Sequence, residues 1–214
     1  MNQQSGPQDP LVISYLALRK AVGIIGCGLP FVLIFGKMLL LGPGIQCTVS
    51  DYYYTDMGNV FVGSLCAIGV FLISCRGYDW RDEIAGRVAC VFAVGVALFP
   101  TNPCAGGTSL IGYLHLTFAA LLFLTLAYFS LALFTETDPD KTPTPQKLQR
   151  NIVYRVCGYT ILLCILFIAV IKLTPLKSLL ERLTPVFWLE SLAIISFGVS
   201  WLTKGETILK DERV

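Results

Sequence analysis

The sequence predicts an all-α, polytopic membrane protein, a six-transmembrane-helix bundle with cytoplasmic N- and C-termini. The 214-residue chain has a mean hydropathy of +0.69 and only 14% charged residues, whereas soluble domains carry about 25%. Its apolar residues gather in long uninterrupted runs, and most lysines and arginines lie between alternate runs. The segments between the runs are too short and polar to bury a core of their own, so one membrane-embedded domain is expected.

Six apolar runs are close to the length of about 17–25 residues that crosses the hydrocarbon of a bilayer. They lie at about 21–42, 59–76, 84–100, 109–134, 152–173 and 185–203. The third run is marginal because Arg87 lies one turn inside it, but an arginine there can extend back to the interface. Residues 1–20 are expected to form a polar tail with an interfacial lead-in, and residues 204–214 a cytoplasmic tail.

The distribution of basic residues predicts the orientation, because cytoplasmic loops are enriched in lysine and arginine. With the N-terminus inside, the inner segments hold twelve basic residues and the outer loops three, all three in the last outer loop. The first two outer loops, at about 43–57 and 101–108, hold none. We therefore expect a multi-pass protein of the plasma or inner membrane.

Charge and composition also limit the classes of partner that the protein is expected to bind. The net charge is only +2 and the basic residues are dispersed among acids, which does not favour nucleic-acid binding. His115 is the single histidine, and the cysteines lack the spacing of a zinc site. We expect membrane lipids as partners, with no metal and no cofactor, and the sequence leaves homo-oligomerisation open.

Cys47 and Cys104 are the two cysteines in predicted outer loops, one in each of the first two. A periplasmic or extracellular face is oxidising, so a disulfide between them is chemically permitted. It requires Cα atoms within about 7 Å. We predict this bridge, and two unrelated surface thiols are the alternative.

Polar residues converge on the outer ends of the predicted spans. Ionisable groups inside a membrane are costly and are usually retained because something uses them. The candidate ligand-binding residues are Lys37, Ser50, Asp51, Tyr54, Asp56, Asn59, Asn102, His115, Trp188 and Glu190.

Helical spacing places Asp56, Asn59, Gly63, Cys66 and Gly69 on one face of the second span. We expect this face to point into the bundle, because small residues let membrane helices approach closely. Glu190 is expected to point inward as well, since a carboxylate that faces lipid is costly. The two acidic side chains would then meet in a polar pocket near the outer mouth.

The order of these residues resembles the six-span DRAM-like family, named for the damage-regulated autophagy modulator, and its bacterial relatives of unknown function. The shared features are short and span residues 21–203: Val49-Ser50-Asp51, Phe61-Val62-Gly63-Ser64-Leu65, Thr101-Asn102, His115 and Phe187-Trp188-Leu189-Glu190. The family pattern places Glu before Trp in the last span, whereas here Trp188 precedes Glu190. The resemblance implies lipid handling or membrane organisation and supplies no catalytic residue.

Three classes of function fit these observations. The outer pocket could bind or organise lipid without catalysis, which we expect. It could belong to an intramembrane lipid hydrolase that uses Asp56, His115 and Glu190 as acid/base groups or metal ligands, although one histidine excludes a three-histidine zinc site within the chain. It could also belong to a small ion- or proton-coupled transporter or channel. Whether the protein is an enzyme is left open by the sequence.

Overall fold

The computed structural model describes residues 10–74, 79–104, 106–137, 142–174 and 180–209, which form helices and no strand. The long helices are α1 (Pro10–Leu41), α2 (Gly58–Ser74), α3 (Trp80–Leu98), α4 (Leu110–Tyr128), α5 (Pro145–Leu173) and α7 (Pro185–Lys204). The short ones are η1 (Ser50–Tyr54), η3 (Glu181–Leu183) and η2 (Phe129–Leu133), a π-helical turn that continues α4. The all-α prediction is therefore confirmed for the described residues.

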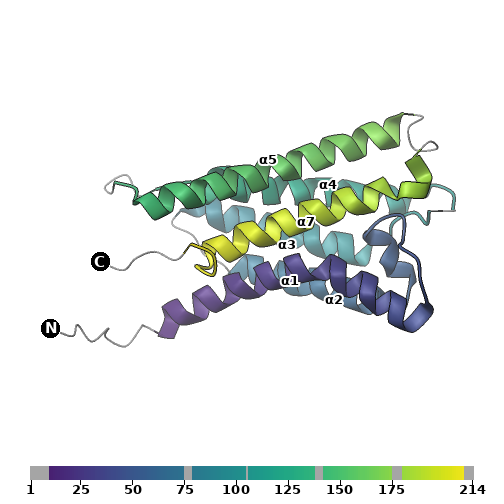
Figure 1. Cartoon of the computed structure of the whole chain (residues 1–214), viewed down its shortest axis with the longest axis horizontal. Helices are drawn as coiled ribbons and strands as arrows, with labels where there is room; N and C mark the ends of the chain where they lie inside the picture. Colours follow the sequence, from purple (N-terminus) through teal and green to yellow (C-terminus); the bar gives the residue numbers. More distant parts are fainter. Residues whose placement is uncertain (1–9, 75–78, 105, 138–141, 175–179, 210–214) are drawn as a thin grey trace.

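The long helices lie side by side and close a ring in the order α1, α2, α3, α4, α5 and α7 (Figure 1). Each helix packs against the next, and α7 packs back against α1. The beginning of α1 and the end of α7 lie at one end of the bundle, which we call the terminal end. The opposite end carries η1 and the α3–α4 connection, and we call it the disulfide end.

Four helices are long and apolar enough to cross a membrane: Tyr15–Leu41, Leu110–Leu133, Pro145–Leu173 and Pro185–Lys204. This is compatible with an integral membrane protein. Helix α2 is apolar but has only 17 residues. Helix α3 carries four charged residues among its first eight, and these lower its hydropathy, as expected for the third run.

Each predicted apolar run coincides with a helix, but α1, α3 and α5 begin several residues earlier than predicted. Helix α1 starts at Pro10, so the expected lead-in is partly helical. Helix α5 starts at Pro145 because Thr144 caps it, accepting a hydrogen bond from the Lys147 amide at 3.1 Å. Residues 1–9, 75–76 and 210–214 of the predicted segments lie outside the described residues.

Helices α1 and α7 are in backbone contact. A Cβ atom on Gly198 would lie 2.6 Å from the backbone nitrogen of Cys27 and 2.8 Å from the carbonyl oxygen of Gly23. Small residues allow this close approach, which gains van der Waals contact where lipid offers no hydrophobic driving force. The pair positions the start of α7, and with it Glu190, relative to α1.

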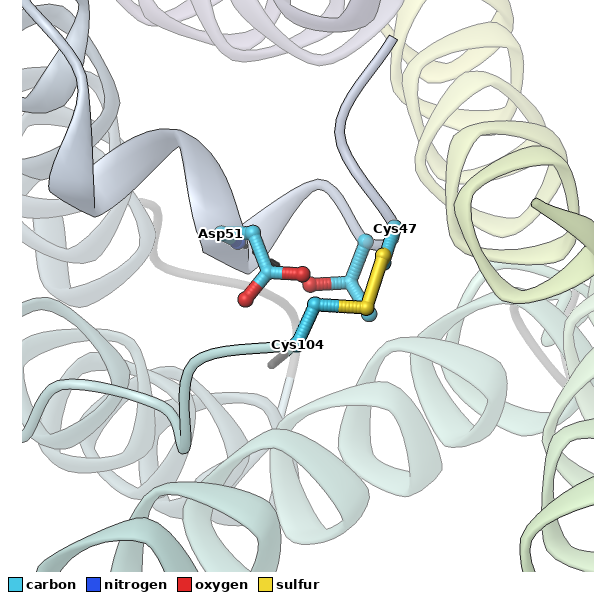
Figure 2. The surroundings of a disulfide bond; sticks show 4 residues. Cys47, Asp51 and Cys104 are labelled. Atoms are coloured by element: carbon cyan, nitrogen blue, oxygen red, sulfur yellow. Dashed lines mark hydrogen bonds between the residues drawn. A yellow bond between two sulfur atoms is a disulfide. The ribbon is translucent and has the colours of Figure 1, made fainter. Parts of the chain in front are cut away.

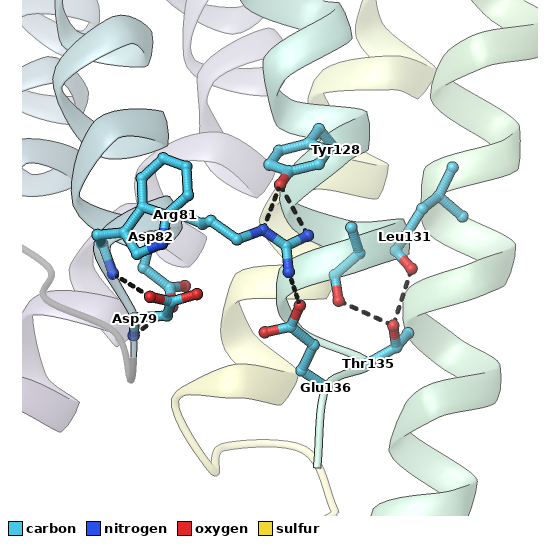
Figure 3. Close-up of polar contacts among 9 residues, drawn as sticks. Asp79, Arg81, Asp82, Tyr128, Leu131, Thr135 and Glu136 are labelled. Carbon is cyan, nitrogen blue, oxygen red and sulfur yellow. Dashed lines mark hydrogen bonds and ion pairs between the residues drawn. The ribbon is translucent and has the colours of Figure 1, made fainter. Parts of the chain in front are cut away.

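Polar contacts join the helices towards the terminal end. Figure 3 shows the Arg81 guanidinium of α3 between Tyr128 and Glu136, with an ion pair of 2.7 Å to the Glu136 carboxylate. Deeper in the bundle, the fully buried hydroxyl groups of Ser130 and Ser200 share a hydrogen bond of 2.9 Å. These contacts connect α3 to the end of α4, and α4 to α7.

Candidate functional site

A disulfide joins the two connections at the disulfide end. Cys47 and Cys104 have Cα atoms 6.2 Å apart and a bonded sulfur pair, so the predicted bridge is present. It ties the chain that follows α1 to the α3–α4 connection, two segments that the sequence separates by 57 residues. Figure 2 shows the bridge beside Asp51 of η1, and a carboxylate oxygen of Asp51 lies within 4.8 Å of both sulfur atoms.

Beneath this bridge lies a pocket of about 420 Å³, which we call the disulfide-end pocket. It is bounded by η1, the α3–α4 connection, the start of α4, the end of α5 and the start of α7. Its polar lining residues are Thr48, Asp51, Thr101, Asn102, Thr108, Tyr113, Lys172 and Thr184. Leu116, Ile171, Leu173 and Val186 supply apolar lining from the helix ends. The pocket therefore combines polar and apolar lining.

Asp51 is the unusual residue of this pocket. It is only 5% exposed, yet neither carboxylate oxygen accepts a hydrogen bond of ordinary geometry from any described residue. Thr48 lies beside it, and the Thr48 hydroxyl oxygen accepts a hydrogen bond from the Asp51 amide at 3.0 Å. Buried carboxylates are normally paired or hydrogen-bonded. Burial therefore raises the pKa of Asp51 above its ordinary range, and the nearby Thr48 and Lys172 only partly oppose this.

This raised pKa predicts a pH dependence of stability. An acid whose pKa is higher in the folded state favours folding when protonated, and this contribution is lost as the pH rises through the folded-state pKa. Relative to Asp51→Asn, the wild type should therefore lose stability as the pH rises from about 4 towards neutrality. Melting temperatures in detergent across this range would measure the difference.

Asp56→Asn removes the same charge from an exposed position of the same connection and serves as the control. If the melting temperatures of the wild type and Asp51→Asn change with pH in the same way, the pKa of Asp51 is the same in the folded and unfolded chains. That result would contradict this prediction.

Asn102 and Tyr54 shape the rim of the disulfide-end pocket. The Asn102 side-chain oxygen accepts hydrogen bonds from the Ser109 amide at 2.8 Å and the Ser109 hydroxyl at 2.9 Å. Ser109 in turn caps α4 by accepting from the Gly112 amide at 3.0 Å. The Tyr54 hydroxyl donates to the Thr101 carbonyl. These residues fix the pocket wall at the beginning of α4.

His115 lies within α4 and has a structural partner. Its Nδ1 atom is 2.6 Å from the carbonyl oxygen of Phe99, and because a carbonyl can only accept, Nδ1 carries the proton of this hydrogen bond. The residue is 3% exposed. It joins the end of α3 to α4 and does not line the disulfide-end pocket.

Glu190 lies in the first turns of α7 and points into the ring, as predicted. Its Oε2 atom accepts a hydrogen bond from the Val49 amide at 2.7 Å. With Ser50 it lines a second, smaller cavity of about 50 Å³ at the centre of the bundle. The rest of that cavity is apolar and comes from α1, α2, α3, α4 and α7. The neighbouring carboxylate that interacts with Glu190 is Asp51.

The predicted meeting of Asp56 and Glu190 is wrong. Asp56, Asn59 and Gly63 are all exposed, so the outer part of the predicted inward face of α2 points outward, and only Gly69 at its other end is buried, against α3. Bulky residues instead fill the ring from the opposite face, namely Phe61, Leu65, Ile68 and Leu72. Helical spacing correctly predicted that the polar residues share one face. The opposite face is buried because its bulky side chains fill the ring interior at close packing.

Two further candidates lie away from the disulfide-end pocket. The Lys37 ammonium donates to the Gly44 carbonyl at 2.8 Å and pairs with neither Asp56 nor Glu190. Trp188 is 53% exposed and packs edge-on against Phe187, as an aromatic residue at a membrane interface would. The structure thus brings Asp51 and Asn102 to the disulfide-end pocket, Ser50 and Glu190 to the central cavity, and His115 to a backbone carbonyl.

Lys172 and Gly112 also line the disulfide-end pocket, and neither was predicted from the sequence to do so. Lys172 had been counted only as a basic residue of the last outer loop, although a lysine at the end of an apolar run is a recognisable charge at the interface. Gly112 lies so close to the Asn102 side chain that a Cβ atom would overlap it. No local pattern of the sequence indicated that contact.

The metal-ligand chemistry of the site depends on the disulfide. Cys47, Asp51 and Cys104 place one ligand atom each within 4.8 Å of one another. Zinc is bound by thiolates, however, and sulfur atoms joined in a disulfide are not thiolates. The oxidised site therefore offers a metal one carboxylate from this group.

Comparison with known proteins places most of the chain within one family. A family model described as "Protein of unknown function (DUF998)" matches residues 24–200. No curated protein and no solved structure matches the chain significantly. The match covers all the residues of the disulfide-end pocket and of the central cavity.

Proposed function

Because the chain belongs to this family of unknown function, we propose from its own geometry that it is a six-span membrane protein whose disulfide-end pocket binds a lipid headgroup without catalysis. The observation that carries the proposal is Asp51, a buried carboxylate that accepts no hydrogen bond of ordinary geometry from the described residues and lines a pocket of about 420 Å³. A buried acceptor of this kind is costly unless a ligand satisfies it.

The topology in this proposal extends the four candidate spans to six. Helices α2 and α3 pack in the same ring as the four longer helices. At a rise of about 1.5 Å per residue they are roughly 25–28 Å long, which is slightly less than the hydrocarbon thickness and within the mismatch that a bilayer accommodates. The excess of basic residues at the terminal end supports cytoplasmic termini and a disulfide end on the oxidising side.

The lining of the pocket supports lipid as the ligand. Most polar groups come from the connections, Tyr113 and Lys172 add polar groups from the ends of α4 and α5, and apolar groups come from the ends of α4, α5 and α7. Tyr113 and Leu173 line the pocket and are also 55% and 85% exposed. In a bilayer these residues would face acyl chains, so a headgroup held near Asp51 could keep its chains in the membrane. This arrangement also fits the lipid handling implied by the DRAM-like resemblance.

A pocket-filling variant tests the proposal. Thr108 lies on the rim in the α3–α4 connection, and Thr108→Trp should occupy space that a headgroup needs. We expect native mass spectrometry to detect phospholipid bound to the wild type and at least about tenfold less on Thr108→Trp, equivalent to about 1.4 kcal/mol.

Thr142→Trp is the matched control, because Thr142 is an exposed residue of a connection at the terminal end. Equal lipid retention by the two tryptophan variants would remove the disulfide-end pocket as the lipid site. Release of a fatty acid or headgroup by the wild type, lost in Asp51→Asn, would instead favour the hydrolase hypothesis.

A further inference from the structure

The two charged groups of the disulfide-end pocket define what kind of headgroup fits it. Asp51 supplies two buried acceptor atoms that accept no hydrogen bond of ordinary geometry within the described part of the chain. A ligand group that satisfies them must donate hydrogen bonds, and a cation does so most strongly because charge-assisted hydrogen bonds exceed neutral ones. The Asp51 carboxylate therefore favours a ligand with a protonated amine.

The positive side of the pocket comes from the end of α5. Lys172 lines the same pocket and interacts electrostatically with Asp51 and Glu190. In the described structure it forms an ion pair with neither carboxylate, since no bridge within 4.0 Å joins them. Lys172 and Asp51 therefore line one pocket without being paired directly.

Two helix beginnings add to this positive side. Gly112 belongs to the first turn of α4, and Thr184, Pro185 and Val186 belong to the beginning of α7; all line the pocket. Helix N-termini carry partial positive charge and favour phosphate. Together with Lys172 they make a phosphate the fitting anion, while the buried Asp51 carboxylate opposes a ligand that is only anionic.

We infer that the disulfide-end pocket selects a zwitterionic headgroup with a primary ammonium and a phosphate, as in phosphatidylethanolamine, which places the ammonium on Asp51 and the phosphate near Lys172. A quaternary ammonium, as in phosphatidylcholine, has the same charge but no N–H group to donate to the two carboxylate oxygens. An anionic headgroup such as that of phosphatidylglycerol brings no cation to Asp51. This inference rests on the proposed lipid-binding function and specifies its ligand.

Lipid titration followed by native mass spectrometry of the full chain tests the inference. The probes are phosphatidylethanolamine, phosphatidylcholine and phosphatidylglycerol with identical acyl chains, added one at a time to delipidated protein. We expect the wild type to prefer phosphatidylethanolamine by about tenfold, the effect of one hydrogen bond to a charged group. Asp51→Asn should abolish that preference, and Lys172→Gln should weaken all three lipids to a similar degree.

Matched controls separate these effects from changes in overall charge. Asp56→Asn and Lys37→Gln remove one charge each at the same end of the bundle, outside the pocket, and should keep the wild-type preference. Equal affinity of the wild type for the three lipids would overturn the inference without needing any variant to fold. So would an unchanged preference in a folded Asp51→Asn protein.

The outcomes also distinguish the choice of headgroup from the proposed lipid-binding function. Lipid that is bound without headgroup preference, but lost in Thr108→Trp, would overturn the ligand assignment and leave the lipid-binding function intact. Absence of bound lipid under all conditions would overturn both. Glycerophosphoethanolamine, which has the headgroup without acyl chains, identifies the source of the ligand. Binding as tight as that of the intact lipid would show that a soluble compound, and not a lipid, is the ligand.

Discussion

Replacing Gly198 with alanine is expected to destabilise the folded protein by about 3 kcal/mol, the upper end of the usual cost of overpacking. The added Cβ atom would lie 2.6 Å from the Cys27 nitrogen and 2.8 Å from the Gly23 carbonyl oxygen. Both atoms are backbone, so no side-chain rotamer can relieve the overlap. Helices α1 and α7 must move apart, and each loses close contact along its length. Unfolding in detergent with a graded denaturant would measure the loss.

Gly28→Ala is the matched control for this prediction. Gly28 lies on α1, as do Gly23 and Cys27, but nothing lies within 4 Å of a Cβ atom built on it. The same substitution there should be neutral or stabilise the helix by about 0.5–1 kcal/mol, because alanine is the better helix former. If Gly198→Ala unfolds no more easily than Gly28→Ala, the backbone contact between α1 and α7 does not contribute as inferred.

The helices could be predicted from the sequence because their signal is continuous. An apolar run such as 185–203 has no competing interpretation as a strand or loop, and α7 spans Pro185–Lys204. The beginnings of α1 and α5 could not be placed in the same way, because they extend beyond the apolar runs. Local chemistry sets them: Thr144 and Pro145 begin α5 in a polar region that hydropathy assigns to a connection.

The candidate site was less predictable because it depends on directions that spacing does not specify. Cys47 and Cys104 could be paired, since the predicted topology left only those two on the outer face. Asp51 was among the candidates, but Asp56 had been preferred as the partner of Glu190. The direction of α2 was set by Phe61 and Leu65 filling the ring interior, a volume that only the assembled helices define. Lys172 reached the pocket through the packing of α5 against α4 and α7.

Glu190→Ala is expected to destabilise the protein by about 2–4 kcal/mol, because it removes the acceptor of a part-buried backbone donor and leaves an unfilled space. The Val49 amide donates to Glu190 Oε2 at 2.7 Å, and this bond connects α7 to the residue before η1, 141 residues away in the sequence. Without it the Val49 N–H group has no acceptor in the described structure, and η1 loses an anchor beside Asp51. Thermal unfolding in detergent and hydrogen exchange at Val49 would both report the change.

Glu190→Gln separates the hydrogen bond from the charge. Glutamine keeps a carbonyl oxygen that can accept from the Val49 amide, so it should retain most of the stability and keep Val49 protected from exchange. If glutamine is as damaging as alanine, the negative charge of Glu190 stabilises the disulfide end and the hydrogen bond is secondary. Wild-type stability in both variants would mean that η1 is held by the disulfide and by its packing alone. Because η1 carries Asp51, loss of the Val49 anchor should also weaken lipid binding in Glu190→Ala while sparing it in Glu190→Gln.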